Sequence, residues 1–164
     1  GWHRIEKQLW VEGDTQGMDP YADELLANVE KIVQLGQDTP LTALEMAQGA
    51  KGLLDEVATG KITGEENEFA HTDLWDFKAN IEGSQAAIAA LRPVLTEQDP
   101  ELVDDLDTQF AALDAELNQY QDPETGDWTF YDELTDEQVK RLSDAVAALS
   151  EPISKVAAVV AQSA

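Results

Sequence analysis

Apolar residues recur every three or four positions along most of this chain, which is the spacing of one face of an α-helix. Leu25, Val29, Ile32 and Val33 follow this spacing in the second such segment. Alternating runs of β-branched residues, typical of strands, do not occur, and Ala, Leu, Glu, Asp and Gln dominate. The pattern predicts helices over about residues 1–11, 20–35, 41–59, 72–96 and 100–120, and a last helix from about 135 almost to the C-terminus.

Local signals mark where several of these helices begin and bend. Pro20 suits the first turn of the second helix, and TDEQ at 135–138 is a capping-box pattern at the start of the last one. Pro93 and Pro152 fall inside predicted helices, where proline bends the backbone. With short polar links between the helices, the sequence predicts an all-α fold, an antiparallel helix bundle.

The charge balance limits the classes of partner that this protein can bind. The chain has 34 acidic and 10 basic residues and a formal net charge of −24, so nucleic acid and anionic membranes are unfavourable partners and cations are favourable ones. Most of these carboxylates are expected to form a solvated surface. Cysteine is absent, which excludes thiolate metal sites and a cysteine nucleophile. The chain contains no run of 18 apolar residues, so no transmembrane helix is predicted.

The opening stretch GWHRIEKQLW contains one of only two histidines in the chain. His3 and Glu6 are three residues apart, so a helix places both on one side, beside an apolar stripe of Trp2, Ile5 and Leu9 that should face the core. An imidazole and a carboxylate in this arrangement can bind one metal ion. The spacing alone is a weak signal, because a surface hydrogen bond between the two side chains accounts for it equally well.

A second segment, GEENEFAHTDLWDFKANIEG, is rich in oxygen ligands. Asp73 is expected to favour the helix N-terminus, as acidic residues do, whereas Asp76 and Asn80 lie further into the helix, beside an apolar stripe. Carboxylates at the edge of a core need partners, and a cation is one such partner. His71 is expected to be a hydrogen-bonded residue at the start of this helix rather than a ligand.

Three segments, GWHRIEKQLW, TQGMDPYADELLANV and GKITGEENEFAHTDLWDFKANIEGSQ, closely resemble the EfeO branch of the imelysin-like family, and the resemblance continues through LRPVL and the C-terminal helices. The family's G-x-H-x-x-E signature is matched by Gly1, His3 and Glu6. The resemblance implies a helical protein of two bundle-like halves. Family members extend well upstream of the signature, so residues 1–164 are expected to be one imelysin-like domain that lacks its N-terminal part.

The resemblance also implies a function. Proteins of the EfeO type serve iron uptake outside the cytoplasm, in the periplasm or at the cell surface, with a membrane permease and a haem-dependent peroxidase. The expected ligands here are His3 and Glu6, with Glu66 as a third and Asp76 as a further ligand or supporting group. Such a set suits iron as Fe²⁺ or Fe³⁺, and zinc or another divalent ion also fits.

Two alternatives from the same family remain open. A metallopeptidase needs three ligands, a water and a general base, but H-E-x-x-H is absent, so a transport component is favoured over an enzyme. Binding of an acidic polysaccharide is opposed by the charge of −24 unless cations bridge the two. The aromatic loop with Trp128, Phe130 and Tyr131 could stack on sugars, although packing against the bundle is the simpler expectation.

Overall fold

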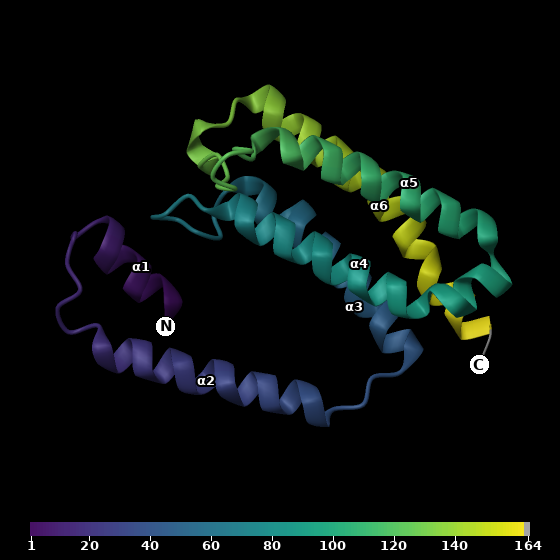
Figure 1. Ribbon diagram of the computed structural model, residues 1–164, viewed down its shortest axis with the longest axis horizontal. Helices are drawn as coiled ribbons and strands as arrows, with labels where there is room; N and C mark the ends of the chain where they lie inside the picture. The colour runs from purple at the N-terminus through teal and green to yellow at the C-terminus, as the bar shows by residue number, and fades with distance from the viewer. Residues whose placement is uncertain (163–164) are drawn as a thin grey trace.

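The computed structural model describes residues 1–162, and this part of the chain is helical without a β-strand, apart from one isolated bridge between Gln121 and Trp128 (Figure 1). The predicted all-α class is confirmed. The α-helices are α1 (Trp2–Trp10), α2 (Asp19–Asp38), α3 (Ala43–Thr59), α4 (Asp73–Gln98), α5 (Pro100–Leu117) and α6 (Asp136–Gln162), and the short 3₁₀ turns are η1 (Lys61–Thr63), η2 (Asn118–Tyr120) and η3 (Tyr131–Glu133).

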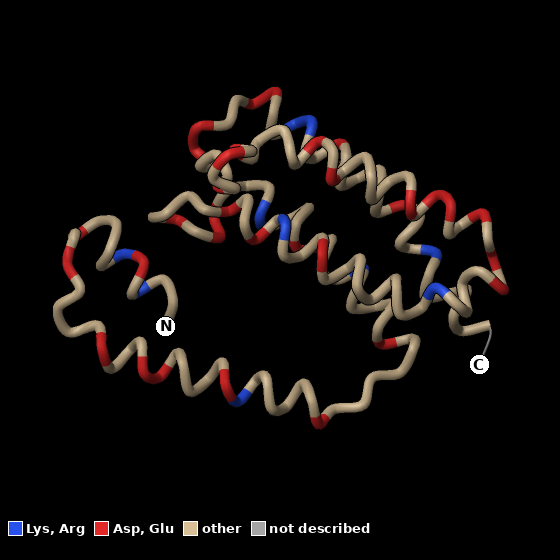
Figure 2. Tube along the Cα trace, viewed as in Figure 1, with Lys and Arg blue, Asp and Glu red and all other residues tan. Residues whose placement is uncertain are grey.

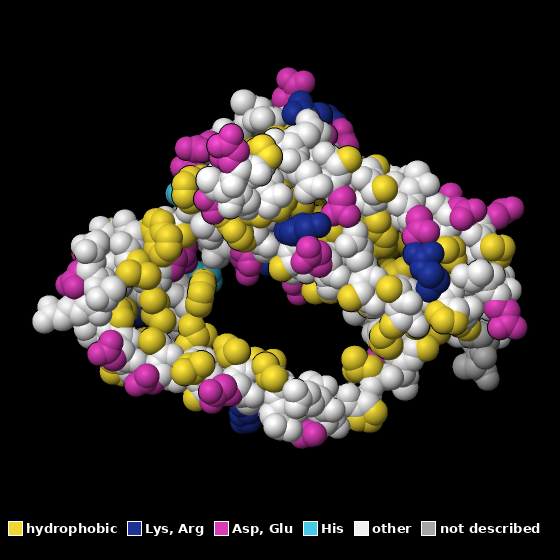
Figure 3. Space-filling view, viewed as in Figure 1, with side chains coloured by type: hydrophobic (Ala, Val, Ile, Leu, Met, Phe, Trp, Pro, Cys, Tyr) yellow, Lys and Arg dark blue, Asp and Glu magenta, His cyan; other side chains and the backbone are white. Residues whose placement is uncertain are grey.

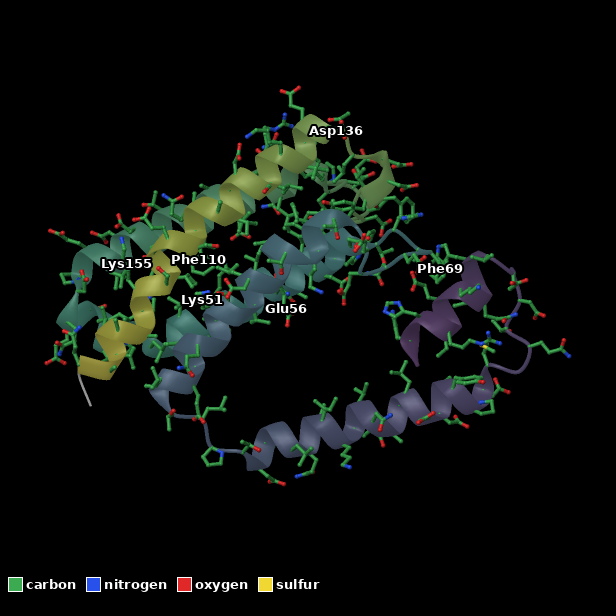
Figure 4. The ribbon with its side chains drawn as sticks, turned by 180° about the vertical axis from the view of Figure 1, so that it is seen from behind. Lys51, Glu56, Phe69, Phe110, Asp136 and Lys155 are labelled. Atoms are coloured by element: carbon green, nitrogen blue, oxygen red, sulfur yellow. The ribbon has the colours of Figure 1, made fainter. Side chains whose placement is uncertain are left out.

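The hydrophobic core lies between α3, α4, α5 and α6, which pack side by side as a bundle (Figure 1). Phe110, labelled in Figure 4, is buried on α5. The apolar stripe predicted on the fourth helix is buried as expected. The side chains with almost no exposure include Leu54, Val57, Leu74, Phe77, Ile81, Leu95, Leu106, Leu113, Leu117, Leu142, Leu149 and Ile153.

The helices α1 and α2 form an arm beside the bundle (Figure 1). The prediction that the apolar stripe of the first helix faces a core is wrong, because Trp2 and Leu9 are exposed and Ile5 is only half-buried. The arm stands away from the core helices along most of its length, so its apolar residues lack the facing helix that burial requires.

On α2 no side chain is buried. Its apolar face, with Leu26, Val29, Ile32 and Val33, is 48–68% exposed. Figure 3 shows hydrophobic side chains of this helix along the opening between the arm and the bundle. Across the opening, α3 and α4 form an apolar groove of about 700 Å³.

The helix termini follow the local signals. Thr135 and Gln138 form the predicted capping box, and Thr42 forms a second one with Glu45. Pro20 lies in the first turn of α2, and the last α-helix of the bundle contains Pro152. The expected 100–120 helix ends at Leu117 and continues as the 3₁₀ turn η2.

The aromatic loop packs largely as expected. Trp128 and Tyr131 are buried, whereas Phe130 is 44% exposed, with its ring 6.4 Å from that of Trp75. The Tyr131 hydroxyl donates a hydrogen bond of 2.6 Å to the carbonyl of Ile62, which fixes the loop to η1.

The acidic residues lie along all six α-helices rather than in one patch (Figure 2). Basic residues are few, and several pair with acids one helical turn away, as Lys155 does with Glu151. Within residues 1–162 no helix is long and apolar enough to cross a membrane.

Candidate metal centre

His3 and Glu6 lie together on α1, as their spacing predicts. The Nδ1 atom of His3 is 2.9 Å from Oε2 of Glu6. The imidazole is 61% exposed and the carboxylate is 4% exposed, so the pair reaches from solvent into the interior. A helix holds residues three apart on one side, and this local geometry needs no tertiary contact.

The burial of Glu6 comes from a different part of the chain. Its Oε1 atom accepts hydrogen bonds of 2.9 Å from the backbone amides of Phe69 and Ala70. Burial raises the pKa of the Glu6 carboxyl, but the hydrogen bonds from His3, Ala70 and Phe69 outweigh it and hold the pKa below its ordinary value. The carboxylate is therefore ionised at neutral pH, and the His3 Nδ1 is the donor toward it.

The segment that supplies these amides is the loop of residues 64–72, which connects η1 to α4. Its tip lies beside α1, where Phe69 is labelled in Figure 4. The Lys7 ammonium stands 5.8 Å from the centre of the Phe69 ring, a cation–π contact between the same two elements. The two segments of the suspected site thus meet in space, as a shared metal centre requires.

Asp73 is the residue of this segment that sequence reasoning undervalued. It is fully buried at the start of α4, and its Oδ1 accepts from the amides of Glu66 at 3.1 Å and Asn67 at 3.4 Å. Its Oδ2 atom is buried without a hydrogen-bond partner among the described residues. The expectation of a helix N-terminal carboxylate holds for its position, but Asp73 binds the preceding loop rather than lying at the surface.

Asp76 is half-buried one turn further along α4, and its Oδ2 accepts from the side-chain amide of Asn67. Burial raises the pKa of the Asp76 carboxyl, and the opposing effects of Lys61 and Asn67 do not cancel this. Asn80, the other deeper residue, donates from its side-chain amide to the carbonyl of Leu53, which is a structural contact between α3 and α4.

Glu66, the expected third ligand, forms an ion pair with a lysine side chain. Its Oε1 lies 3.2 Å from the ammonium of Lys61, a lysine that is only 6% exposed. A buried ammonium needs an anionic partner, and Glu66 supplies it. Lys61 is the residue here that sequence reasoning missed, because nothing local indicates that a lysine in a polar connection becomes buried.

His71 is hydrogen-bonded just before α4, as expected, but through its backbone: its amide donates to the carbonyl of Asn67 at 2.8 Å. Its Nε2 is 3.9 Å from Asp132, and its backbone carbonyl accepts from the Tyr131 amide. Its φ angle of 55° is the only positive value at a non-glycine position in residues 1–162. This left-handed conformation costs about 1 kcal/mol or more, which the loop contacts around it must offset.

The surroundings of the pair are mainly aromatic and apolar. A pocket of about 160 Å³ beside Glu6 is lined by Trp2, Ile5, Leu9 and Trp10 of α1 and by Ala70 of the loop, among others. A second hollow of about 310 Å³ lies between Trp2 and Trp75 and reaches Asn67 and Asp76. Asp76 therefore borders the same region as the pair without touching it.

Of the four expected ligands, the structure joins His3 with Glu6 and leaves Glu66 and Asp76 on partners of their own. In residues 1–162 no group of three or more histidine, aspartate and glutamate side chains is placed to hold a metal ion. The pair supplies an imidazole nitrogen and a carboxylate oxygen on one side of α1, and both are ligand types that such an ion accepts. Their separation of 2.9 Å is that of the hydrogen bond between them.

A helical bundle, flanked by an arm whose first helix carries a histidine–glutamate pair next to an acidic loop, defines the class of this protein. The chain belongs to the imelysin family: residues 1–156 match the family model described as Imelysin, of the Peptidase_M75 group. The predicted membership and EfeO-type resemblance are confirmed.

The curated relatives carry a more specific name. The chain is 39% identical over 160 residues to the iron uptake system component EfeO of Escherichia coli O157:H7, an alignment that covers 98% of this chain and 42% of the relative. It is 38% identical, with the same coverage, to the proteins of that name from Escherichia coli K12 and Shigella flexneri. The chain thus spans less than half the length of the curated relatives that it matches.

Proposed function

We propose that this chain is a metal-binding component of an iron-uptake system, and that His3 and Glu6 bind the iron as a pair. The observation that carries the proposal is the distance of 2.9 Å between Nδ1 and Oε2, on two side chains held by one helical turn. For both atoms to bind one ion, the hydrogen bond between them would open: the Nδ1 proton would move to Nε2 by a change of imidazole tautomer, and both side chains would turn their lone pairs toward the ion.

The chemistry of the donors suits the cargo. A carboxylate and an imidazole bind hard to borderline cations, a range that includes Fe²⁺, Fe³⁺ and Zn²⁺. The net charge of −24 raises the local concentration of any cation, so it favours capture without selecting iron. Glu66 and Asp76 are the further ligands we propose, and each must leave its present partner, Lys61 or Asn67, to reach the ion.

The printed name of the relatives supports iron uptake as the process. We propose that the protein acts outside the cytoplasm, at the periplasmic or outer surface, where a membrane iron permease and a haem-dependent peroxidase are its partners. Handing iron to such partners favours a site that releases its ion readily, and Glu66 and Asp76 can return to Lys61 and Asn67 when the ion leaves.

Calorimetric titration of Fe²⁺ under anaerobic conditions, repeated with Fe³⁺ citrate and Zn²⁺, tests the proposal. We expect His3→Ala and Glu6→Gln to lose at least tenfold in iron affinity, while His71→Ala binds like the parent. His71 is the matched control because it is the other histidine and is also exposed. Equal affinity of His3→Ala and the parent overturns the proposal, since the remaining binding then belongs to the general acidic surface.

A further inference from the structure

The two carboxylate oxygens of Glu6 face different partners. Oε2 faces His3, and Oε1 accepts from the amides of Phe69 and Ala70, so the side chain is engaged at both ends. At 4% exposure it has almost no contact with water. Glu6 of α1 thus forms hydrogen bonds both with His3, in the candidate ion site, and with a loop more than 60 residues further along the chain.

That loop is fastened at its other side to the bundle. Asp73, at the start of α4, accepts from the amides of Glu66 and Asn67, just before the two amides that Glu6 holds. Four backbone amides within five residues therefore point at two buried carboxylates, one from the arm and one from the bundle. These hydrogen bonds are buried or partly buried, so an amide left without its acceptor there is destabilising.

The arm has little else to hold it. α2 has no buried side chain, and α1 buries only Glu6. Further contacts between α1 and the loop, among the described residues, include the cation–π contact of Lys7 with Phe69 and the small apolar pocket beside Ala70. The hydrogen bonds of Glu6 are thus the main polar contact through which α1 docks onto the loop.

We propose that Glu6 is a positioning residue that couples occupancy of the ion site to docking of the α1–α2 arm on the loop of residues 64–72. The proposal rests on the function proposed above. The carboxylate places its Oε2 atom 2.9 Å from Nδ1 of His3, while its Oε1 atom accepts hydrogen bonds from the two amides. An ion that binds this orientation preferentially stabilises the docked arm by mass action, and arm docking favours ion binding equally.

Hydrogen exchange of the backbone amides of Phe69 and Ala70 tests the coupling, measured by mass spectrometry on the full chain. Without metal, Glu6→Ala removes both acceptors, so we expect these amides to exchange about tenfold faster, the effect of roughly 1.4 kcal/mol. Glu6→Gln should stay near the parent, because its amide oxygen still accepts from both. Exchange within α6 is the internal control. Unchanged exchange in Glu6→Ala overturns the proposal.

The second arm of the experiment adds Fe²⁺ under anaerobic conditions, with binding measured by calorimetry on the same samples. We expect iron to slow exchange at Phe69 and Ala70 several-fold in the parent and to leave it unchanged in His3→Gln, a change that removes the imidazole but keeps the acceptor of both amides. Iron binding without slower exchange overturns the coupling alone. Absence of iron binding at the pair overturns the proposed function, and the coupling with it.

Discussion

The Oε1 atom of Glu6 lies 2.9 Å from the backbone nitrogen of Ala70, a residue 64 positions further along the chain. This contact joins the first helix to the loop before α4. Glu6, the glutamate of the G-x-H-x-x-E signature, therefore accepts hydrogen bonds from backbone amides in addition to the one from His3. The same region contains Asp73 and Tyr131, whose burial leads to predictions that do not depend on metal.

Asp73→Ala should destabilise the fold by about 1–3 kcal/mol, because it leaves the buried amide of Asn67 and the partly buried amide of Glu66 without their acceptor. Asp55→Ala is the control, since Asp55 forms an exposed pair with Lys51 one helical turn away and should change stability by at most about 0.5 kcal/mol. Urea unfolding followed by circular dichroism measures both. Equal effects of the two changes would contradict the assigned role of Asp73.

Gly64→Ala should be strongly destabilising. Gly64 has a φ angle of 71°, and a Cβ atom there would overlap the ring of Tyr131. That ring is buried, and its hydroxyl is hydrogen-bonded to the carbonyl of Ile62. Gly13→Ala is the matched control, because Gly13 has a similar φ of 65° and open space around the added atom. We expect about 1 kcal/mol of loss for Gly13→Ala from backbone strain alone, and clearly more for Gly64→Ala, in thermal unfolding. A smaller loss at Gly64 would mean that the ring moves away freely.

Ile32→Gln on α2 should leave the unfolding free energy within about 0.5 kcal/mol of the parent, because this side chain is 68% exposed. Leu54→Ala, in the core, should cost about 2–5 kcal/mol. Ile32→Gln should also reduce binding of a hydrophobic dye, since it removes part of the exposed apolar face. A large loss of stability in Ile32→Gln would show that α2 is packed more tightly in solution.

Acid should weaken the junction between α5 and α6. Burial raises the pKa of Glu116, but hydrogen bonds from Tyr120, Arg141 and Gln119 outweigh it and lower the pKa. A carboxyl whose pKa is lower in the folded state contributes stability above its ordinary pKa and loses it as the pH falls through the folded value. Glu116→Gln should therefore be less stable than the parent at pH 7, with a difference that shrinks toward pH 3. A constant difference across this range would contradict the argument.

Salt should raise the melting temperature. The acidic residues outnumber the basic ones by far, so their repulsion in the folded state is screened as ionic strength rises. Sodium chloride between 10 mM and 500 mM, followed by calorimetry, measures this. At matched ionic strength, Mg²⁺ should do no more than sodium if the acids form only a solvated surface. A melting temperature that responds to neither salt would contradict the repulsion.

The helices and the His3–Glu6 pair follow from residues that are close together in the chain. Helical spacing, the capping box at Thr135 and the short polar links depend on residues close in the chain, so they predicted the all-α class and most helix bounds within a few residues. His3 and Glu6 adjoin for the same reason, because one helical turn suffices to bring them together.

The burial of individual polar groups cannot be predicted from the sequence pattern and follows from the fold. Nothing in the spacing of Asp73, Asp76 and Lys61 shows that Asp73 is sealed under the loop, that Asp76 is half-buried or that the Lys61 ammonium is enclosed with Glu66. The same holds for α2, whose apolar stripe predicts a buried face and is exposed among the described residues. Burial depends on which distant segments pack together. A periodic pattern shows that a helix face is apolar, but not which segment covers it.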